Sequence, residues 1–372
     1  MRVLLLGALG ATGRRTAGEL VRNPELEKLV VAGRDPVHLQ RFARALDSSN
    51  ERVTPAVVDV HDQDEARNAF ERVDAVVSCA GPHYLTEYPA AKASILAGVS
   101  YVSLCDEYPA AQRAQSLSEI AQERGVTVVN GCGLSPGITN FMIDLAAGHL
   151  EQVEEINIAL ARSATESEGR ATALHFLYEL TRDAPFVSDH EPSTEPAATS
   201  PKLVFFPEPV GWVETFRCGH PEVVTLPHTY PDLTSLQFRI GLTEKATMDV
   251  ARAFVATPLA HSETARNLFV NFSRPLRPLV NNLPPRGPSW SAARVDVRGN
   301  SKGRSSTITY GVVDHLANFV SVPLARAAVE LGSGRVSHPG VHPPEKVFET
   351  KPFLRHLLER GIRVAELEPR TV

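Results

Sequence analysis

Three glycines at the start of the chain constrain its fold more than any other feature. Gly7, Gly10 and Gly13 lie between the apolar run VLLL and a stretch with helical periodicity. Glycine at such a turn lets the backbone bend tightly and approach a pyrophosphate, while the amides at the start of a helix attract an anion. The spacing is GxxGxxG, and its place between a strand and a helix predicts a phosphate-binding turn. The alternative is a glycine-rich turn without a ligand.

Short apolar strands alternate with amphipathic helices through about the first 148 residues, which is typical of βαβ units. The strands are expected at residues 2–6, 29–32, 53–60, 75–78, 101–104 and 126–130. The helices are expected at residues 12–22, 36–46, 62–71, 89–97 and 110–124. The pattern predicts an α/β fold with a Rossmann doubly wound parallel sheet, whose ligands lie beyond the carboxyl ends of the strands.

The pattern changes after about residue 150, and a chain of 372 residues is expected to form more than one domain. A strand at 155–161 and a helix at 171–181 precede a Pro-rich stretch, 185–209, that predicts a long loop. Residues 293–298 alternate, turn at 300–303 and return through 306–312, which predicts a β-hairpin. We expect a Rossmann domain of residues 1–132, completed by 340–372. Residues 133–339 are expected to form a second, α+β domain with a mixed or antiparallel sheet that binds the substrate.

Composition and charge exclude several classes of protein. The net charge is −5 and no long block of like charge occurs, so nucleic acid is not an expected partner. No apolar run reaches the roughly 18 residues of a membrane helix, so we expect no membrane span and a cytoplasmic protein. The four cysteines lack CxxC spacing and the histidines lack HExxH spacing, so no metal is predicted.

The end of the second strand bears on the choice of cofactor. Many NAD-binding domains carry an acid there for the ribose hydroxyl, whereas here Arg34 is the first charged residue. A guanidinium grips a phosphate with two hydrogen bonds, so NADP(H) is favoured over NAD(H). The alternative is NAD(H), because the next residue, Asp35, is an acid. A second alternative is that Arg34 is a solvated turn residue without a role in binding.

The ends of the later strands supply the other site candidates. Catalytic proton transfer is assigned to Asp106, His83 and Tyr84, although Asp106 could instead cap the helix near Ala110 or be a solvated loop acid. The cofactor-binding candidates lie at the first four strand ends: Gly7, Gly10, Ala11, Thr12, Gly13, Arg34, Asp59, Cys79, Ala80 and Gly81. The substrate-binding candidates follow the fifth and sixth strands: Cys105, Gly133, Leu134, Ser135, Pro136, Gly137 and Asn140. The cysteines among them could also be small buried hydrophobic residues.

Lysine is scarce near these strand ends. Lys92 is the only lysine between positions 29 and 201, and it lies on an expected helix. A Schiff-base mechanism is therefore disfavoured. Direct hydride transfer, in which the protein orients the cofactor, is favoured instead.

Three stretches of the chain resemble the saccharopine dehydrogenase-like family, which includes saccharopine reductase, lysine 6-dehydrogenase and carboxynorspermidine dehydrogenase. They are the glycine turn, Gly-Leu-Ser-Pro-Gly-Ile-Thr-Asn at 133–140, and Gly-Val-His-Pro-Pro-Glu at 340–345. The resemblance implies NAD(P)-dependent reduction of imines or oxidation of amines, and a homodimer formed through the second domain. Relatives often carry Tyr-Val-Asp-Leu at the fifth strand, where this chain has Ser103 in place of the aspartate.

Three functions therefore compete. The first is an NADP(H)-dependent oxidoreductase that acts on a carbon–nitrogen bond, imine or amine, of an amino-acid-like substrate. The second is an NADPH-dependent reductase of a carbon–carbon double bond in an acyl or lipid-like substrate. The third is a non-catalytic NADP(H)-binding sensor. The fold does not choose among them.

Overall fold

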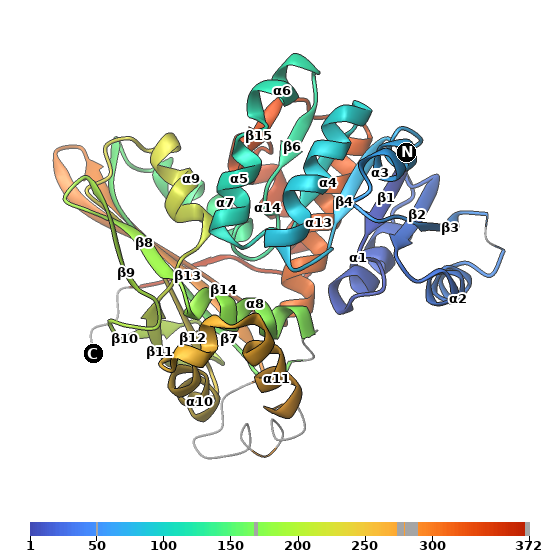
Figure 1. The fold of residues 1–372 in the computed structure, drawn as a ribbon. Coiled ribbons are helices and arrows are strands. Elements are labelled where there is room, and N and C mark those ends of the chain that lie inside the picture. Colours follow the sequence, from blue (N-terminus) through green and yellow to red (C-terminus); the bar gives the residue numbers. More distant parts are fainter. Residues whose placement is uncertain (50, 167–169, 274–278, 280–288, 369–372) are drawn as a thin grey trace. The chain divides into compact units, whose positions relative to one another are not determined.

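The computed structural model describes residues 1–49, 51–166, 170–273, 279 and 289–368. The chain forms two compact units (Figure 1). Unit 1 comprises Met1–Asn140 and Ala317–Arg360, and unit 2 comprises Phe141–Leu316 and Gly361–Val372. Among the described residues, no helix is both long enough and apolar enough to cross a membrane.

Unit 1 contains a parallel sheet of seven strands in the order β15-β6-β5-β4-β1-β2-β3. Its strands are β1 (Arg2–Leu6), β2 (Lys28–Gly33), β3 (Val53–Val57), β4 (Ala75–Ser78), β5 (Ser100–Ser103), β6 (Thr127–Val129) and β15 (Gly340–His342). Apolar runs suit strands that are covered on both faces, and β1 and β4 are almost entirely buried. The order confirms the predicted doubly wound sheet and adds β15, which lies parallel to β6.

Most helices of unit 1 connect successive strands of this sheet, and α14 (Thr350–Glu359) follows its last strand, β15. The other helices are α1 (Ala11–Val21), α2 (Pro36–Leu46), α3 (Gln63–Phe70), α4 (His83–Ala97), α5 (Tyr108–Gln115), α6 (Ser118–Glu123) and α13 (Leu316–Gly332). The single helix predicted over 110–124 is wrong, because the chain bends between α5 and α6. Two backbone hydrogen bonds form this bend, from the Ser116 N–H to the Arg113 carbonyl and from the Leu117 N–H to the Ala114 carbonyl. The bend buries Leu117 in the core.

The helix predicted to begin at residue 89 begins six residues earlier, at His83. Pro89, at the start of the predicted helix, lies inside α4. The first turn is stable because the Glu107 carboxylate accepts hydrogen bonds from the backbone N–H groups of His83 and Tyr84. His83 and Tyr84 were expected on a loop and instead lie in this first turn.

Unit 2 is built on a second sheet, in the order β10-β11-β12-β7-β13-β14-β16, with β8 beside β12 and β9 beside β8. The strands are β7 (Gln152–Arg162), β8 (Asp183–Ser188), β9 (Glu191–Pro196), β10 (Lys202–Phe206), β11 (Gly211–Arg217), β12 (Ser235–Leu242), β13 (Ser291–Ser301), β14 (Arg304–Asp314) and β16 (Ala365–Glu366). Its described helices are α8 (Arg170–Leu180), α9 (Pro221–Thr229), α10 (Lys245–Val255) and α11 (Glu263–Ser273), while α7 (Ile138–Ala147) begins at the unit boundary. Only β7 and β12 pair in parallel among these neighbours, so the sheet is mixed, as predicted.

The hairpin of β13 and β14 is confirmed, and its turn residues Lys302 and Gly303 both have positive φ angles. The long loop predicted over 185–209 is wrong, because this stretch contains all of β9 and β10 and most of β8. Proline interrupts a strand only where its missing N–H is needed by a partner. Pro185 lies beyond the part of β8 that pairs with β12, and β9 is an edge strand with β8 as its described neighbour.

The two units divide the chain differently from the expected domains 1–132 with 340–372 and 133–339. Residues 133–140 and most of α13 lie in unit 1, where a Cβ on Gly332 would approach the side chains of Ala75 and Met1 at 3.3 Å. Residues after Arg360 lie in unit 2, because β16 pairs with β14. The sequence of a helix indicates its apolar face, but not the sheet on which that face packs.

Candidate functional site

The turn between β1 and α1 is built so tightly that two of its glycines have no room for a side chain. A Cβ on Gly7 would lie 2.7 Å from the backbone of Cys79 and Ala80, and Gly7 also has a φ of +69°. A Cβ on Gly13 would lie 2.2 Å from the carbonyl oxygen of Gly7. Both glycines are therefore required by the fold itself. The turn is thereby held against the end of β4.

Gly10 differs from these two glycines. It is exposed, has an ordinary φ of −66°, and its Cβ would meet only the Gly7 carbonyl, at 3.3 Å. Gly10 is the N-cap residue of α1, no side chain caps this helix, and its first turn carries no acid. The positive end of the helix therefore faces outward at a residue without a side chain, which suits an anion such as a diphosphate. Ala11 and Thr12 form the same helical turn.

Two neighbouring charged residues with different roles, Arg34 and Asp35, follow β2. Asp35 is the N-cap of α2, and its carboxylate accepts hydrogen bonds from the His38 backbone N–H at 3.0 Å and from His38 Nδ1 at 2.7 Å. The pKa of Asp35 is lowered, chiefly because of that backbone hydrogen bond. Arg34 is exposed beside it. Asp35 therefore caps α2, and Arg34 is an exposed cation at this strand end.

Two further cofactor candidates lie at the ends of β3 and β4. The Asp59 carboxylate accepts a hydrogen bond from the His61 backbone N–H at 3.0 Å. The Cys79 backbone N–H donates to the Leu6 carbonyl, and its Sγ lies 3.7 Å from the Thr16 hydroxyl. Burial raises the pKa of the Cys79 thiol to about 12, so this thiol stays neutral and is not a nucleophile. Ala80 and Gly81 follow Cys79 in the segment that connects β4 to α4.

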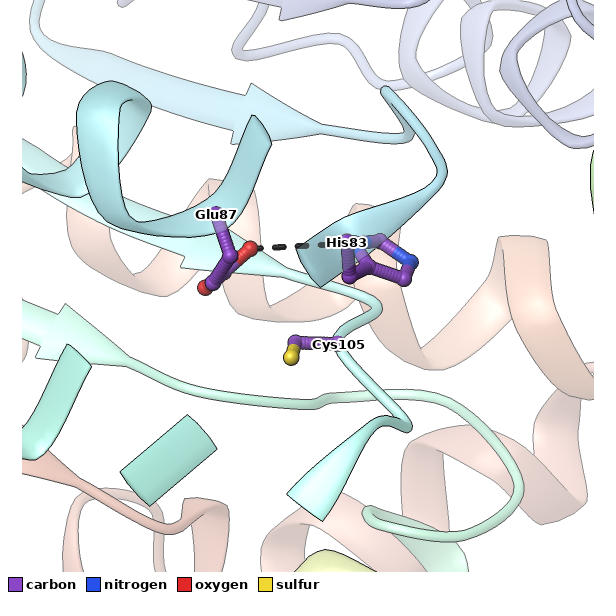
Figure 2. Close-up of side chains that lie close together, drawn as sticks. All are labelled: His83, Glu87 and Cys105. Atoms are coloured by element: carbon purple, nitrogen blue, oxygen red, sulfur yellow. Dashed lines mark ion pairs between the residues drawn. The ribbon is translucent and has the colours of Figure 1, made fainter. Parts of the chain in front are cut away.

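A charged cluster surrounds His83 (Figure 2). The His83 Nδ1 atom lies 3.8 Å from Glu87 Oε2, one helical turn along α4, and its Nε2 atom lies 3.9 Å from Asp106 Oδ1. These distances exceed hydrogen-bond length, so both contacts are ion pairs. The His83 side chain is 12% exposed, while Glu87 is fully buried. A buried carboxylate requires a cation nearby, and His83 is placed to supply it.

Two hydroxyl groups fix the position of the Glu87 carboxylate. Tyr101 donates its hydroxyl to one oxygen at 3.0 Å, and Ser103 donates to the other at 2.7 Å. Both donors belong to β5 and are completely buried. The carboxylate is therefore held rigidly by the sheet, and it holds the imidazole in turn.

The charges around His83 also set its protonation. Burial alone lowers the pKa of a histidine, but the carboxylates of Glu87, Asp106 and Glu107 outweigh it and leave the pKa of His83 above its ordinary value. The surrounding carboxylates thus stabilise the imidazolium relative to the neutral ring. The arrangement gives one side chain that holds a proton and lies at the strand ends of unit 1.

Cys105 completes a group that has the spacing of a metal site. One ligand atom from each of His83, Glu87 and Cys105 lies within 4.8 Å of the others. Burial, followed by the charge of Glu87, raises the pKa of the Cys105 thiol well above its ordinary value. Both oxygens of Glu87 already accept hydrogen bonds from Tyr101 and Ser103, so we interpret the cluster as a His–Glu ion pair beside a thiol.

The other two predicted catalytic residues flank this cluster. The Tyr84 backbone N–H donates to Glu107 at 2.6 Å, and the Asp106 side chain is 32% exposed. The alternative that Asp106 caps the helix near Ala110 is wrong, because the N-cap position of α5 is Glu107. Glu87 and Glu107 were both missed by the sequence interpretation. The signal was available in the i,i+4 spacing of His83 and Glu87, but only with the correct helix start.

The predicted substrate-binding loop is buried. Every residue from Gly133 to Asn140 is buried, as are Cys105 and Cys132. The loop closes on itself through hydrogen bonds from Gly133 N–H to the Pro136 carbonyl at 2.7 Å and from Gly137 N–H to Asn140 Oδ1 at 2.8 Å. These bonds give Leu134, Ser135 and Pro136 a fixed local structure. Contact between this loop and a substrate stays a prediction.

Comparison with known proteins agrees with this architecture. Residues 3–129 match the family described as "Saccharopine dehydrogenase NADP binding domain". Among solved structures, the chain is similar to saccharopine dehydrogenase (L-Glu forming) from Saccharomyces cerevisiae, with 16% identity, a TM-score of 0.64, and coverage of 99% of this chain and 100% of that one. It is also similar to an amine dehydrogenase from Mycobacterium smegmatis, with 13% identity, a TM-score of 0.50, and coverage of 94% and 97%.

Proposed function

We propose, on the premise that the chain belongs to the saccharopine dehydrogenase-like family of NAD(P)-binding oxidoreductases, that it is NADP(H)-dependent and acts on a carbon–nitrogen bond of an amino-acid-like substrate. The observation that carries this proposal is the uncapped start of α1 at Gly10, inside a domain that matches an NADP-binding family. The residues present fit the cofactor, because the space at Gly10 that a side chain would fill is left open.

The residues of unit 1 have distinct roles in this reaction. The turn from Gly7 to Gly13 binds the diphosphate, and the ends of β4 and β5 line the space beyond it. The bound nicotinamide supplies or accepts the hydride. His83 donates a proton to the substrate nitrogen when an imine is reduced, and accepts that proton when an amine is oxidised. Glu87 positions the imidazole and favours its charged form.

The preference for NADP(H) is assigned to Arg34. Its guanidinium is exposed at the end of β2, whereas the Asp35 carboxylate is already bound to the start of α2. We expect the R34D variant to lose at least roughly tenfold in the NADPH to NADH ratio of kcat/KM, because a charge-assisted pair with the 2′-phosphate is lost and a repulsive charge is added.

The matched control for R34D is D35N, which changes the neighbouring charge but keeps an N-cap side chain. The D35N variant is expected to keep the preference for NADPH. A preference that moves in D35N and stays in R34D would assign cofactor choice to Asp35 instead.

A direct assay separates the proposed reaction from its competitors. The purified protein is mixed with NADPH and with imines formed in solution from 2-oxo acids and amines, or with enones, and NADPH consumption is followed. We expect consumption with imines of amino-acid-like structure. Consumption with enones alone, or tight NADPH binding without turnover on either panel, would contradict the proposal. The homodimer and the cytoplasmic location stay predictions.

A further inference from the structure

Unit 2 contains a cavity of about 300 Å³ at one end of its sheet. The described residues that line the cavity come from the ends of β7 and β12, from α8, α10 and α11, and from the segment after β7, and all of them belong to unit 2. Of these thirteen described residues ten are apolar, and the polar ones are Arg162, Thr247 and Ser273. This volume lies at the lower end of the range for small-molecule pockets.

The wall of the cavity is ordered by aromatic packing. Phe269 of α11 stacks on Phe254 of α10, with ring centroids 4.0 Å apart and an angle of 14° between the planes. Leu177 of α8 and Val270 of α11 are buried at the base, with 3% and 2% of their surface exposed. The cavity is thus bounded by helices that are already packed against one another.

The rim of the cavity exposes apolar surface to solvent. Phe272 is 73% exposed and Val250 is 46% exposed, and both line the cavity. Exposed apolar side chains around a concave apolar volume are characteristic of a ligand-binding surface. Apolar cavities bind apolar molecules, because most of the wall offers no hydrogen bonds; here only Arg162, Thr247 and Ser273 among the described lining residues have polar side chains.

We propose that this cavity binds an unbranched hydrocarbon chain, because its wall is mostly apolar and its volume lies within the range of small-molecule pockets. The chain enters past Phe272 and Val250 and lies against Leu177, Phe269 and Val270. The inference goes beyond the proposed function, because it adds an alkyl or acyl chain to the ligands of the protein. It does not depend on the cofactor, since every described lining residue belongs to unit 2.

The test uses 1-decanol and 1-hexanol as probes and the full chain, with binding measured by calorimetry. We expect one molecule of 1-decanol to bind per chain and 1-hexanol to bind roughly 200-fold more weakly, since each buried methylene adds about a factor of four. Equal affinity for the two alcohols, or no binding of 1-decanol up to its solubility limit, would overturn the proposal.

Two variants locate the probe in the cavity. The A251F variant places a ring inside the cavity, where Ala251 is 6% exposed, and is expected to weaken 1-decanol binding by more than roughly tenfold. The V250S variant removes apolar surface at the exposed rim without disturbing the core. If A251F does not fold, V250S still tests the proposed site. It is expected to weaken binding by a factor of about three.

The matched control is L268S, because Leu268 is 51% exposed on α11 and does not line the cavity. We expect L268S to bind 1-decanol like the unmodified chain. Binding that is unchanged in A251F and V250S, or reduced equally in L268S, would place the alcohol elsewhere and refute the proposed site. NADPH affinity is measured in parallel, so a failure of the cofactor assignment is seen separately.

Discussion

The G10V variant is expected to lose roughly 100-fold in affinity for NADPH while the protein stays folded. The valine side chain occupies the space in front of the start of α1, where the diphosphate is proposed to bind, and each lost hydrogen bond to a charged group costs about 1.5–3 kcal/mol. The fold tolerates the change because Gly10 has an ordinary φ angle and only one close neighbour, at 3.3 Å. Calorimetric titration with NADPH measures the effect, and thermal unfolding checks the fold.

The control for G10V is G18V, the same substitution on the same helix. A Cβ on Gly18 would have no atom within 4 Å, so this variant is expected to bind NADPH normally. The variants G7A and G13A make a further contrast, because both are expected to destabilise the protein before any ligand is added. An NADPH affinity in folded G10V equal to that of G18V would remove the phosphate-binding role from this turn.

The H83Q variant is expected to lower kcat for imine reduction by roughly 100-fold or more, with little change in NADPH affinity. Loss of a positioned proton donor costs about 10²–10⁴ in rate. The control is H338Q, because His338 also lies in unit 1 but is exposed. If kcat of H83Q equals that of H338Q, His83 does not transfer the proton, and Asp106 or Tyr84 becomes the candidate donor.

The pH dependence of kcat tests the role of Glu87. Imine reduction requires protonated His83, so kcat is expected to fall as the pH rises through the pKa of His83, which Glu87, Asp106 and Glu107 raise above its ordinary value. In E87Q one of these charges is lost, so the fall is expected at lower pH. An E87D variant should move the profile back toward that of the unmodified chain. A role of Glu87 in folding alone would lower the amount of active protein without moving the profile.

The same pKa shift bears on stability. Because the pKa of His83 is raised in the folded chain, its ion pairs stabilise the fold fully below the ordinary histidine pKa of about 6.5. That contribution is lost as the pH rises through the raised pKa. Unfolding of the unmodified chain and of E87Q should therefore differ more in mild acid than in mild alkali.

The sequence predicts the parallel sheet well, for a physical reason. Strands such as Arg2–Leu6 and Ala75–Ser78 are covered on both faces, so their apolar runs and flanking turns are unambiguous. The glycine turn is equally easy to recognise in the sequence, because nearby backbone atoms leave no space for a side chain at Gly7 and Gly13. In each case the residues that reveal the element are neighbours in the sequence, even where, as at Gly7, the atoms that require a glycine belong to a distant segment.

The parts that the sequence did not predict depend on contacts between distant segments. The start of α4 is stabilised by Glu107, more than twenty residues away, and no rule for helix caps within the segment reveals it. The prolines of β8 and β9 predict a loop from sequence alone. The structure shows that none of them lies in the part of β8 that pairs with β12. The buried carboxylate of the cluster likewise comes from Glu87 on α4, and Ser103 on β5 binds it.

The most direct test of the account is a crystal structure of the complex with NADPH. The account predicts that the diphosphate oxygens lie within hydrogen-bond distance of the backbone amides at the start of α1, between Gly10 and Gly13. A dinucleotide bound with its diphosphate at any other place in the molecule would contradict it.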